Sequence, residues 1–181
     1  MRKLKNIELE RLTIEEFKQA GKFPIVIVLD NIRSQNNIGS AFRTGDAFRV
    51  ESIYLCGITA TPPHRDIHKT ALGAENTVDW KYFENTISAI NILKDKGYKI
   101  VAVEQAAQST MLQHFNLNIS EKLALVFGNE IDGVEESIMD IADYCIEIPQ
   151  FGTKHSLNIT VSMGIVIWHL TSQALHAFDL K

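Results

Sequence analysis

The chain has 181 residues, of which 45% are hydrophobic and 22% are charged, enough to bury the core of one globular domain. Its formal net charge of −4 does not indicate nucleic-acid binding, and its two cysteines argue against a disulfide framework and fit a reducing cytoplasm. Residues 155–178, the longest stretch without Lys, Arg, Asp or Glu, are too rich in polar side chains for a membrane span, and the N-terminus lacks the apolar core of a secretion signal.

The first predicted element is a helix that starts after Thr13, because Thr13 and Glu16 form a capping-box pattern. Pro24 separates it from residues 25–29, a continuously apolar run typical of a strand buried on both faces. Similar runs predict further strands at residues 52–55, 99–103, 123–127 and 145–148, with a weaker candidate at 78–82. Helical patterns lie between them, at residues 38–48, 86–96, 134–141 and 157 to about 178. This alternation predicts an α/β fold, a mainly parallel sheet flanked by helices.

We expect residues 1–181 to form a single domain, in which residues 1–22 are a short helical extension. The last predicted helix is apolar on more than one side. One face can pack on the sheet, and we expect a second copy of the chain to cover another, which predicts a homodimer. The alternative is a helix enclosed in the core of a monomer.

The first polar loop, residues 30–37, leads from a strand into a helix, and Asn36 or Asn37 is the expected N-cap. Arg43 follows among apolar residues and should lie near the core, where a guanidinium needs a polar or anionic partner. Pairing with Asp46 or Glu51 is the structural alternative to a role in ligand binding.

Two later blocks also follow predicted strands. Gly128 ends one strand, allows a tight turn and close approach of a ligand to the backbone, and precedes Glu130. An ordinary strand–helix turn is the structural alternative for this pair, and the block taken alone favours it. Neither GxGxxG nor GxxxxGK[ST] occurs in the chain. Pro149 ends the next strand, and Ser156 is a good N-cap for the last helix.

Taken together, these blocks resemble the SpoU branch of the SPOUT superfamily, the RNA ribose 2′-O-methyltransferases. The resemblance rests on Asn37 with Arg43, on Gly128 with Glu130, and on the pattern I-P-x-x-G-x-x-x-S-L-N at residues 148–158. It covers about residues 25–170 and implies an α/β knot fold with a C-terminal trefoil knot. It also implies S-adenosylmethionine as cofactor, a tRNA or rRNA as substrate, and no metal. A base methyltransferase of the same fold and a non-catalytic RNA-binding or assembly factor are the alternatives.

The resemblance also implies roles for individual residues. Arg43 matches the family's principal catalytic residue, and our hypothesis is that it holds a phosphate and stabilises negative charge on the 2′ oxygen. The residues expected to hold the reacting groups in place are Asn37, Glu130, Ser156 and Asn158. Those expected to line the cofactor pocket are Val103, Glu104, Gly128, Ile148 and Leu157.

RNA contact must depend on local basic groups, because the chain as a whole is acidic. The main candidates are Arg33, Arg65, Lys69 and Lys154, with Arg2, Lys3, Lys5 and Arg11 near the N-terminus. Many relatives carry an additional N-terminal RNA-binding domain, and we expect none here. His64 and His68 have the i, i+4 spacing of a metal pair, but no third ligand is evident, so no metal site is predicted.

Overall fold

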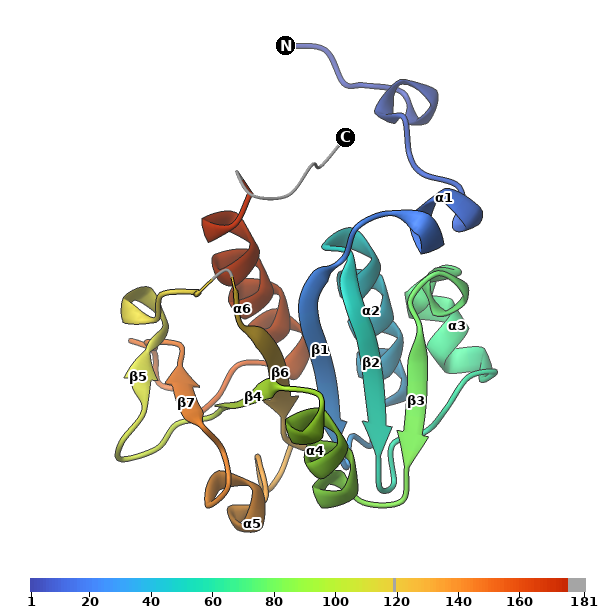
Figure 1. Cartoon of the computed structure of the whole chain (residues 1–181). Helices are drawn as coiled ribbons and strands as arrows, with labels where there is room; N and C mark the ends of the chain where they lie inside the picture. Colours follow the sequence, from blue (N-terminus) through green and yellow to red (C-terminus); the bar gives the residue numbers. More distant parts are fainter. Residues whose placement is uncertain (119, 176–181) are drawn as a thin grey trace.

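The computed structural model of the chain describes residues 1–118 and 120–175 (Figure 1). In this part of the chain seven strands form one sheet, in the order β3-β2-β1-β6-β4-β7-β5, and every neighbouring pair is parallel. The strands are β1 (Phe23–Asp30), β2 (Val50–Cys56), β3 (Trp80–Phe83), β4 (Tyr98–Val103), β5 (Thr110–Met111), β6 (Lys122–Phe127) and β7 (Tyr144–Glu147). The α-helices are α1 (Ile14–Gln19), α2 (Gln35–Ala47), α3 (Arg65–Ala71), α4 (Thr86–Asp95), α5 (Glu136–Met139) and α6 (Ile159–Gln173). Short 3₁₀ helices are η1 (Asn6–Leu9), η2 (Ala74–Asn76) and η3 (Leu112–His114).

The helices cover both faces of the sheet, which confirms the predicted fold class (Figure 1). On one face, α2, α3 and α6 pack over alternate residues of the central strands, including Ile27, Leu125 and Phe127. On the other face, α4 and α5 cover the intervening residues, such as Val28 and Val126. Because successive side chains of a strand point to opposite faces, a strand covered on both sides must be continuously apolar.

Element boundaries differ from the predictions where local hydrogen bonding decides them. Ser34, rather than Asn36 or Asn37, caps α2, since its Oγ accepts the N–H of Asn37 at 3.3 Å. The predicted helix at residues 134–141 is only the four-residue α5. Strand β5 was not predicted, because its two exposed residues carry no apolar run. The reciprocal bonds of Thr13 and Glu16 at the start of α1 confirm the capping box.

Helix α6 is apolar on two sides, as predicted. Its inner side, including Met163 and Leu170, is buried against the sheet, whereas Val161, Ile165 and Trp168 are exposed. The helix ends at Gln173, and its predicted extension to about residue 178 lies partly outside the described residues. The C-terminal trefoil knot stays a prediction. Within residues 1–118 and 120–175, no helix has the length and apolar composition needed to cross a bilayer.

Candidate active site

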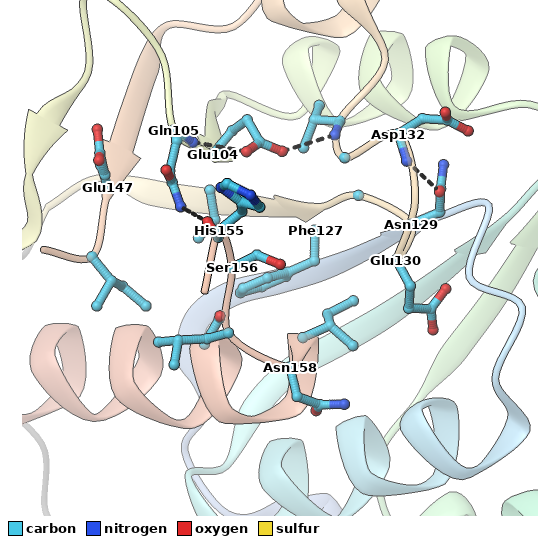
Figure 2. Close-up of a pocket in the computed structure, with 18 of the residues that line it drawn as sticks. Glu104, Gln105, Phe127, Asn129, Glu130, Asp132, Glu147, His155, Ser156 and Asn158 are labelled. Carbon is cyan, nitrogen blue, oxygen red and sulfur yellow. Dashed lines mark hydrogen bonds between the residues drawn. The ribbon is translucent and has the colours of Figure 1, made fainter. Parts of the chain in front are cut away.

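A cavity of about 660 Å³ opens at the carboxyl ends of β4, β6 and β7 (Figure 2). The loop after β4, the loop after β6 and the loop between β7 and α6 form its walls. Ligands of open α/β sheets bind at this edge, and the volume is in the range of small-molecule sites. The cavity is lined by all five residues predicted for the cofactor: Val103, Glu104, Gly128, Ile148 and Leu157.

The loop after β6 is held in a tight turn by its own backbone. The N–H of Asn129 donates to the carbonyl of Gly133 at 3.1 Å, and the N–H of Gly133 donates to the carbonyl of Asn129 at 3.2 Å. Asn129 Oδ1 also accepts the amides of Ile131 and Asp132. A Cβ on Gly128 would lie 1.9 Å from the carbonyl carbon of Gly133. The tight turn expected at Gly128 is therefore confirmed, and the approach of the loop's own backbone requires glycine there. The expected approach of a ligand to this backbone stays a prediction.

Glu104 joins two walls of the cavity. Its Oε1 accepts the N–H of Gln105 at 2.8 Å, and its Oε2 accepts the N–H of Val134 at 3.1 Å (Figure 2). Gln105 Nε2 in turn donates to the carbonyl of His155 at 2.6 Å. The carboxylate of Glu104 is thus occupied in fixing loops around the cavity.

Three residues predicted to hold the reacting groups line the same cavity, and hydrogen bonds attach a fourth. Glu130, Ser156 and Asn158 are lining residues. Asn37, at the start of α2, donates from Nδ2 to Glu130 Oε1 at 2.8 Å and accepts from Asn158 Nδ2 at 3.4 Å. These two bonds form the hydrogen-bonded series Glu130–Asn37–Asn158, with Asn37 in the middle, which ties α2 to two loops of the cavity.

Asn158 is also the N-cap of α6, a role that the sequence had assigned to Ser156. Its Oδ1 accepts the N–H of Thr160 at 2.9 Å and the hydroxyl of Thr160 at 2.6 Å. Because Oδ1 is engaged by these donors, Nδ2 is the atom that faces Asn37. Asn37 must then offer its own Nδ2 to Glu130, since an ionised carboxylate only accepts. Helix capping thus sets the direction of the whole chain of bonds.

The profile of one protein family, described as the SpoU rRNA Methylase family, matches residues 24–168. The chain belongs to this family. The match includes every residue of the cavity walls named above, from Val103 to Asn158.

Individual relatives agree with this assignment. A 23S rRNA (guanosine-2′-O-)-methyltransferase RlmB of Neisseria meningitidis serogroup B is 30% identical over 80% of the chain and 56% of that protein. A tRNA (guanosine(18)-2′-O)-methyltransferase of Borreliella burgdorferi is 30% identical over 81% of the chain and 65% of that protein. The chain therefore spans less than two thirds of either relative.

Solved structures of the family share the fold. The TrmH/SpoU tRNA modifying enzyme of A. aeolicus superposes with a TM-score of 0.79, at 24% identity, over 91% of this chain and 83% of that chain. An AdoMet-bound rRNA methyltransferase of Sinorhizobium meliloti gives a TM-score of 0.77 at 25% identity, over 92% of this chain and 60% of that one.

Arg43, which the resemblance implies as the principal catalytic residue, does not line this cavity. It is exposed on α2, which corrects the expectation that it lies near the core. It forms no ion pair with any residue in the described ranges, and the suggested partner Asp46 instead accepts from Thr77 Oγ1 at 2.6 Å. Six residues of helix turn the direction of the side chain by about 240° relative to Asn37. Arg43 therefore lies on a different side of α2 from Asn37, the α2 residue of the Glu130–Asn37–Asn158 series.

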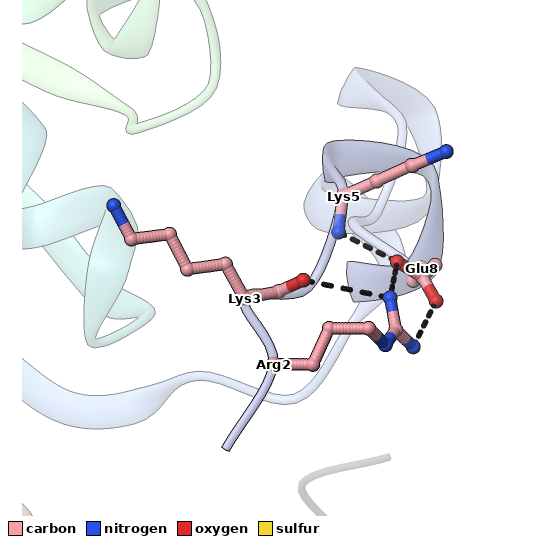
Figure 3. A network of polar contacts seen from close by, with 4 residues as sticks. All are labelled: Arg2, Lys3, Lys5 and Glu8. Carbon is pink, nitrogen blue, oxygen red and sulfur yellow. Dashed lines mark hydrogen bonds and ion pairs between the residues drawn. The ribbon is translucent and has the colours of Figure 1, made fainter.

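The residues predicted to contact RNA also lie outside this cavity. Arg33, Arg65, Lys69 and Lys154 are all exposed, and among the described residues none of them forms an ion pair. Near the N-terminus, Arg2 is engaged with Glu8 at 2.8 and 2.9 Å, whereas the Nζ atoms of Lys3 and Lys5 point away from this pair (Figure 3). The charge of Arg2 is thus partly offset within the chain.

The two histidines at i, i+4 spacing do not converge. His64 caps α3, accepting the N–H of Asp66 at Nδ1, and His68 contacts Glu75. In the described ranges no group of three or more His, Cys, Asp or Glu side chains is placed to hold a metal ion.

Sequence reasoning missed the residues that join the loops. Gln105 and His155 connect the loop after β4 to the loop before α6, and Asn129 shapes the turn after β6. Gln105 and Asn129 each lie two residues beyond the end of a predicted strand, and this position was the available signal. The bond from Gln105 to the backbone of His155 had no signal, because it joins residues fifty positions apart.

Proposed function

We propose that this chain transfers a methyl group from S-adenosylmethionine to a ribose 2′-hydroxyl of a tRNA or rRNA. The observation that carries the proposal is the hydrogen-bonded series Glu130–Asn37–Asn158 at a cavity built from three strand-end loops. The names of the two relatives, both guanosine-2′-O-methyltransferases, support ribose over base as the acceptor. The AdoMet-bound structure of the Sinorhizobium meliloti enzyme supports the cofactor.

The chemistry of the cavity fits this cofactor. Val103, Ile148 and Leu157 offer apolar contact for an adenine ring, and the turn at Gly128 offers backbone groups. Four carboxylates also line the cavity and favour a cation: Glu104, Glu130, Asp132 and Glu147. S-adenosylmethionine, when bound, supplies a methyl group on a positively charged sulfur.

The polar residues at the cavity orient the acceptor. Asn158 is fixed by the cap of α6, and Asn37 holds one oxygen of the Glu130 carboxylate. Ser156 and the second oxygen of Glu130 then contact the ribose. Because these polar side chains are held in place before the substrate binds, the entropic cost of the reaction is lower. Walls that exclude water favour transfer, because the charges of the sulfonium and of the attacking oxygen are both lost in the step.

Arg43 requires a second subunit in this proposal. The exposed side of α6, with Val161, Ile165 and Trp168, is the surface through which we propose a homodimer. Trp168 contacts Phe48 just after α2, with ring centroids 6.2 Å apart, so the interface would include the region of Arg43. Arg43 would then serve the partner's cavity, where its fork of donors holds a phosphate and stabilises charge on the 2′ oxygen. Arg33, Arg65, Lys69 and Lys154 would hold the RNA backbone.

Residues 1–181 form one methyltransferase domain that works in the cytoplasm, where the free thiols Cys56 and Cys145 stay reduced.

Calorimetry with S-adenosylmethionine, followed by nucleoside mass spectrometry of treated tRNA and rRNA, tests the function. We expect saturable cofactor binding and 2′-O-methylated nucleosides in the product. Methyl groups on bases would support the alternative enzyme class, and bound RNA without product would support an assembly factor. Arg43→Ala should abolish product while keeping cofactor affinity, and Arg43→Lys should not restore it, because lysine lacks the fork. Near-full activity in Arg43→Lys contradicts the proposed role.

A further inference from the structure

A second cavity, of about 540 Å³, lies between α3, η2 and the start of β3, away from the strand ends that form the first one. Trp80, Pro62 and Pro63 give it apolar walls, and His64, Arg65, His68 and Glu75 give it polar ones. Helix α3 is tied to the start of α2, because Thr70 Oγ1 donates to the carbonyl of Asn36 at 2.9 Å. Helix α3, which forms one wall of the cavity, is therefore attached to the helix that carries Asn37 and Arg43.

Glu75 is the unusual residue of this cavity. Its side chain is only 9% exposed, and its Oε1 lies 2.5 Å from His68 Nδ1. Its Oε2 is buried and has no hydrogen-bond partner among the described residues. Burial acts to raise the pKa of Glu75, but the bond from His68 and the nearby amides of Glu75 and Gly73 outweigh it and lower the pKa. The group is therefore a carboxylate at neutral pH.

The contact between His68 and Glu75 ties α3 to η2, but this structural role explains only one of the two carboxylate oxygens of Glu75. The contact with His68 accounts for Oε1, but a buried carboxylate oxygen without a donor costs free energy, which a tether alone does not require. The free oxygen belongs to a residue that lines a cavity with an aromatic wall and a cationic rim. Arg65 on that rim is exposed and forms no ion pair with a described residue.

We infer that this cavity is a second nucleotide subsite, which takes an unpaired base of the RNA substrate and selects bases that carry an exocyclic amino group. Unpaired RNA bases are recognised by stacking on aromatic side chains and by hydrogen bonds to their edges. Trp80 supplies the stacking surface, Glu75 Oε2 accepts from the amino group, and Arg65 contacts the adjoining phosphate. The inference rests on the proposed function, because it assumes that the substrate is RNA.

Cytosine and uracil test the selection directly. Cytosine offers an amino donor at position 4, whereas uracil offers a carbonyl oxygen there, which a carboxylate repels. Fluorescence anisotropy of labelled hexacytidylate and hexauridylate, without cofactor, measures the two affinities at fixed salt. A hydrogen bond to a charged group predicts that the wild-type protein binds hexacytidylate about tenfold more tightly.

Glu75→Gln places an amide where the carboxylate was, so the preference should fall below about twofold or reverse toward hexauridylate. Glu136→Gln is the matched control, because it removes the same charge from α5 on the opposite face of the sheet and should keep the preference. Equal wild-type affinities, or a preference that persists in Glu75→Gln, would overturn the inference. Equal wild-type affinities overturn it even if the variant does not fold.

Calorimetry with S-adenosylmethionine separates this result from the proposed function. Cofactor binding without discrimination between the two oligonucleotides overturns the subsite and leaves the methyltransferase proposal standing. Discrimination without cofactor binding supports the subsite and contradicts the methyltransferase proposal.

Discussion

Replacement of Glu104 by glutamine should weaken cofactor binding mainly by releasing the loop after β6, in addition to removing one charge that favours a cation. The carboxylate accepts the amides of Gln105 and Val134, and Gln would present an N–H group to one of these two donors. A hydrogen bond to a charged group contributes about 1.5–3 kcal/mol, and 1.4 kcal/mol is a factor of about ten in affinity. If the loop after β6 must be closed to bind, the Kd for S-adenosylmethionine should rise about tenfold to hundredfold in Glu104→Gln.

Two measurements on the same protein check this reasoning. Calorimetry gives the Kd, and hydrogen exchange gives the protection of the Val134 amide, which should fall in the variant before any cofactor is added. Glu147→Gln is the control for loss of charge alone, because Glu147 lines the same cavity but accepts from Ser109 Oγ at 2.6 Å instead of from the loop after β6. It should leave the protection of the Val134 amide unchanged and raise the Kd less than Glu104→Gln does. Unchanged Val134 protection together with unchanged affinity in Glu104→Gln would refute the positioning role.

Five further results are expected. Asn158→Ala removes the cap of α6 and should cost about 0.5–2 kcal/mol of stability, measured by urea unfolding. Asn158→Asp keeps the cap but loses the Nδ2 donor to Asn37, so methylation should fall while stability stays near wild type. Equal activity of Asn158→Asp and wild type would contradict the proposal that these polar residues orient the acceptor. Burial raises the pKa of Cys56 to about 12 and also raises the pKa of the half-buried Cys145. A thiol reagent at pH 8 should therefore modify Cys145 first and Cys56 only on unfolding, and peptide mass spectrometry would show the order. Burial acts to raise the pKa of Asp143, but the Ile100 amide and Lys99 outweigh burial and lower the pKa. Ionised Asp143 therefore stabilises the fold above the ordinary carboxyl pKa, and this stabilisation is lost as pH falls through the pKa that Asp143 has in the folded protein. In Asp143→Asn the free energy of unfolding should depend less on pH over that acidic range. Ile165→Asp should shift the protein from dimer to monomer in sedimentation and abolish methylation, whereas a variant that remains dimeric contradicts the proposed interface.

The sequence by itself determined the class of fold and the edge of the sheet where the site lies. Continuous apolar runs such as residues 25–29 and 123–127 can be satisfied only by strands covered on both faces, and the structure has them as β1 and β6. Because Gly128 directly follows such a strand, and Glu104 follows another, both had to lie at carboxyl ends, where a parallel sheet brings its loops together.

Only the tertiary structure decided how these loops are joined. Strand order depends on contacts between distant segments, so no local pattern placed β4 between β6 and β7. The contact of Glu104 with Val134 and the capping of α6 by Asn158 instead of Ser156 follow from that order and from the path of the chain between β7 and α6. The exposure of Arg43 has the same origin, because α2 turns this side chain away from the sheet and the cavity lies on the other side. Local sequence fixes which residues prefer burial, and long-range packing fixes which of them meet.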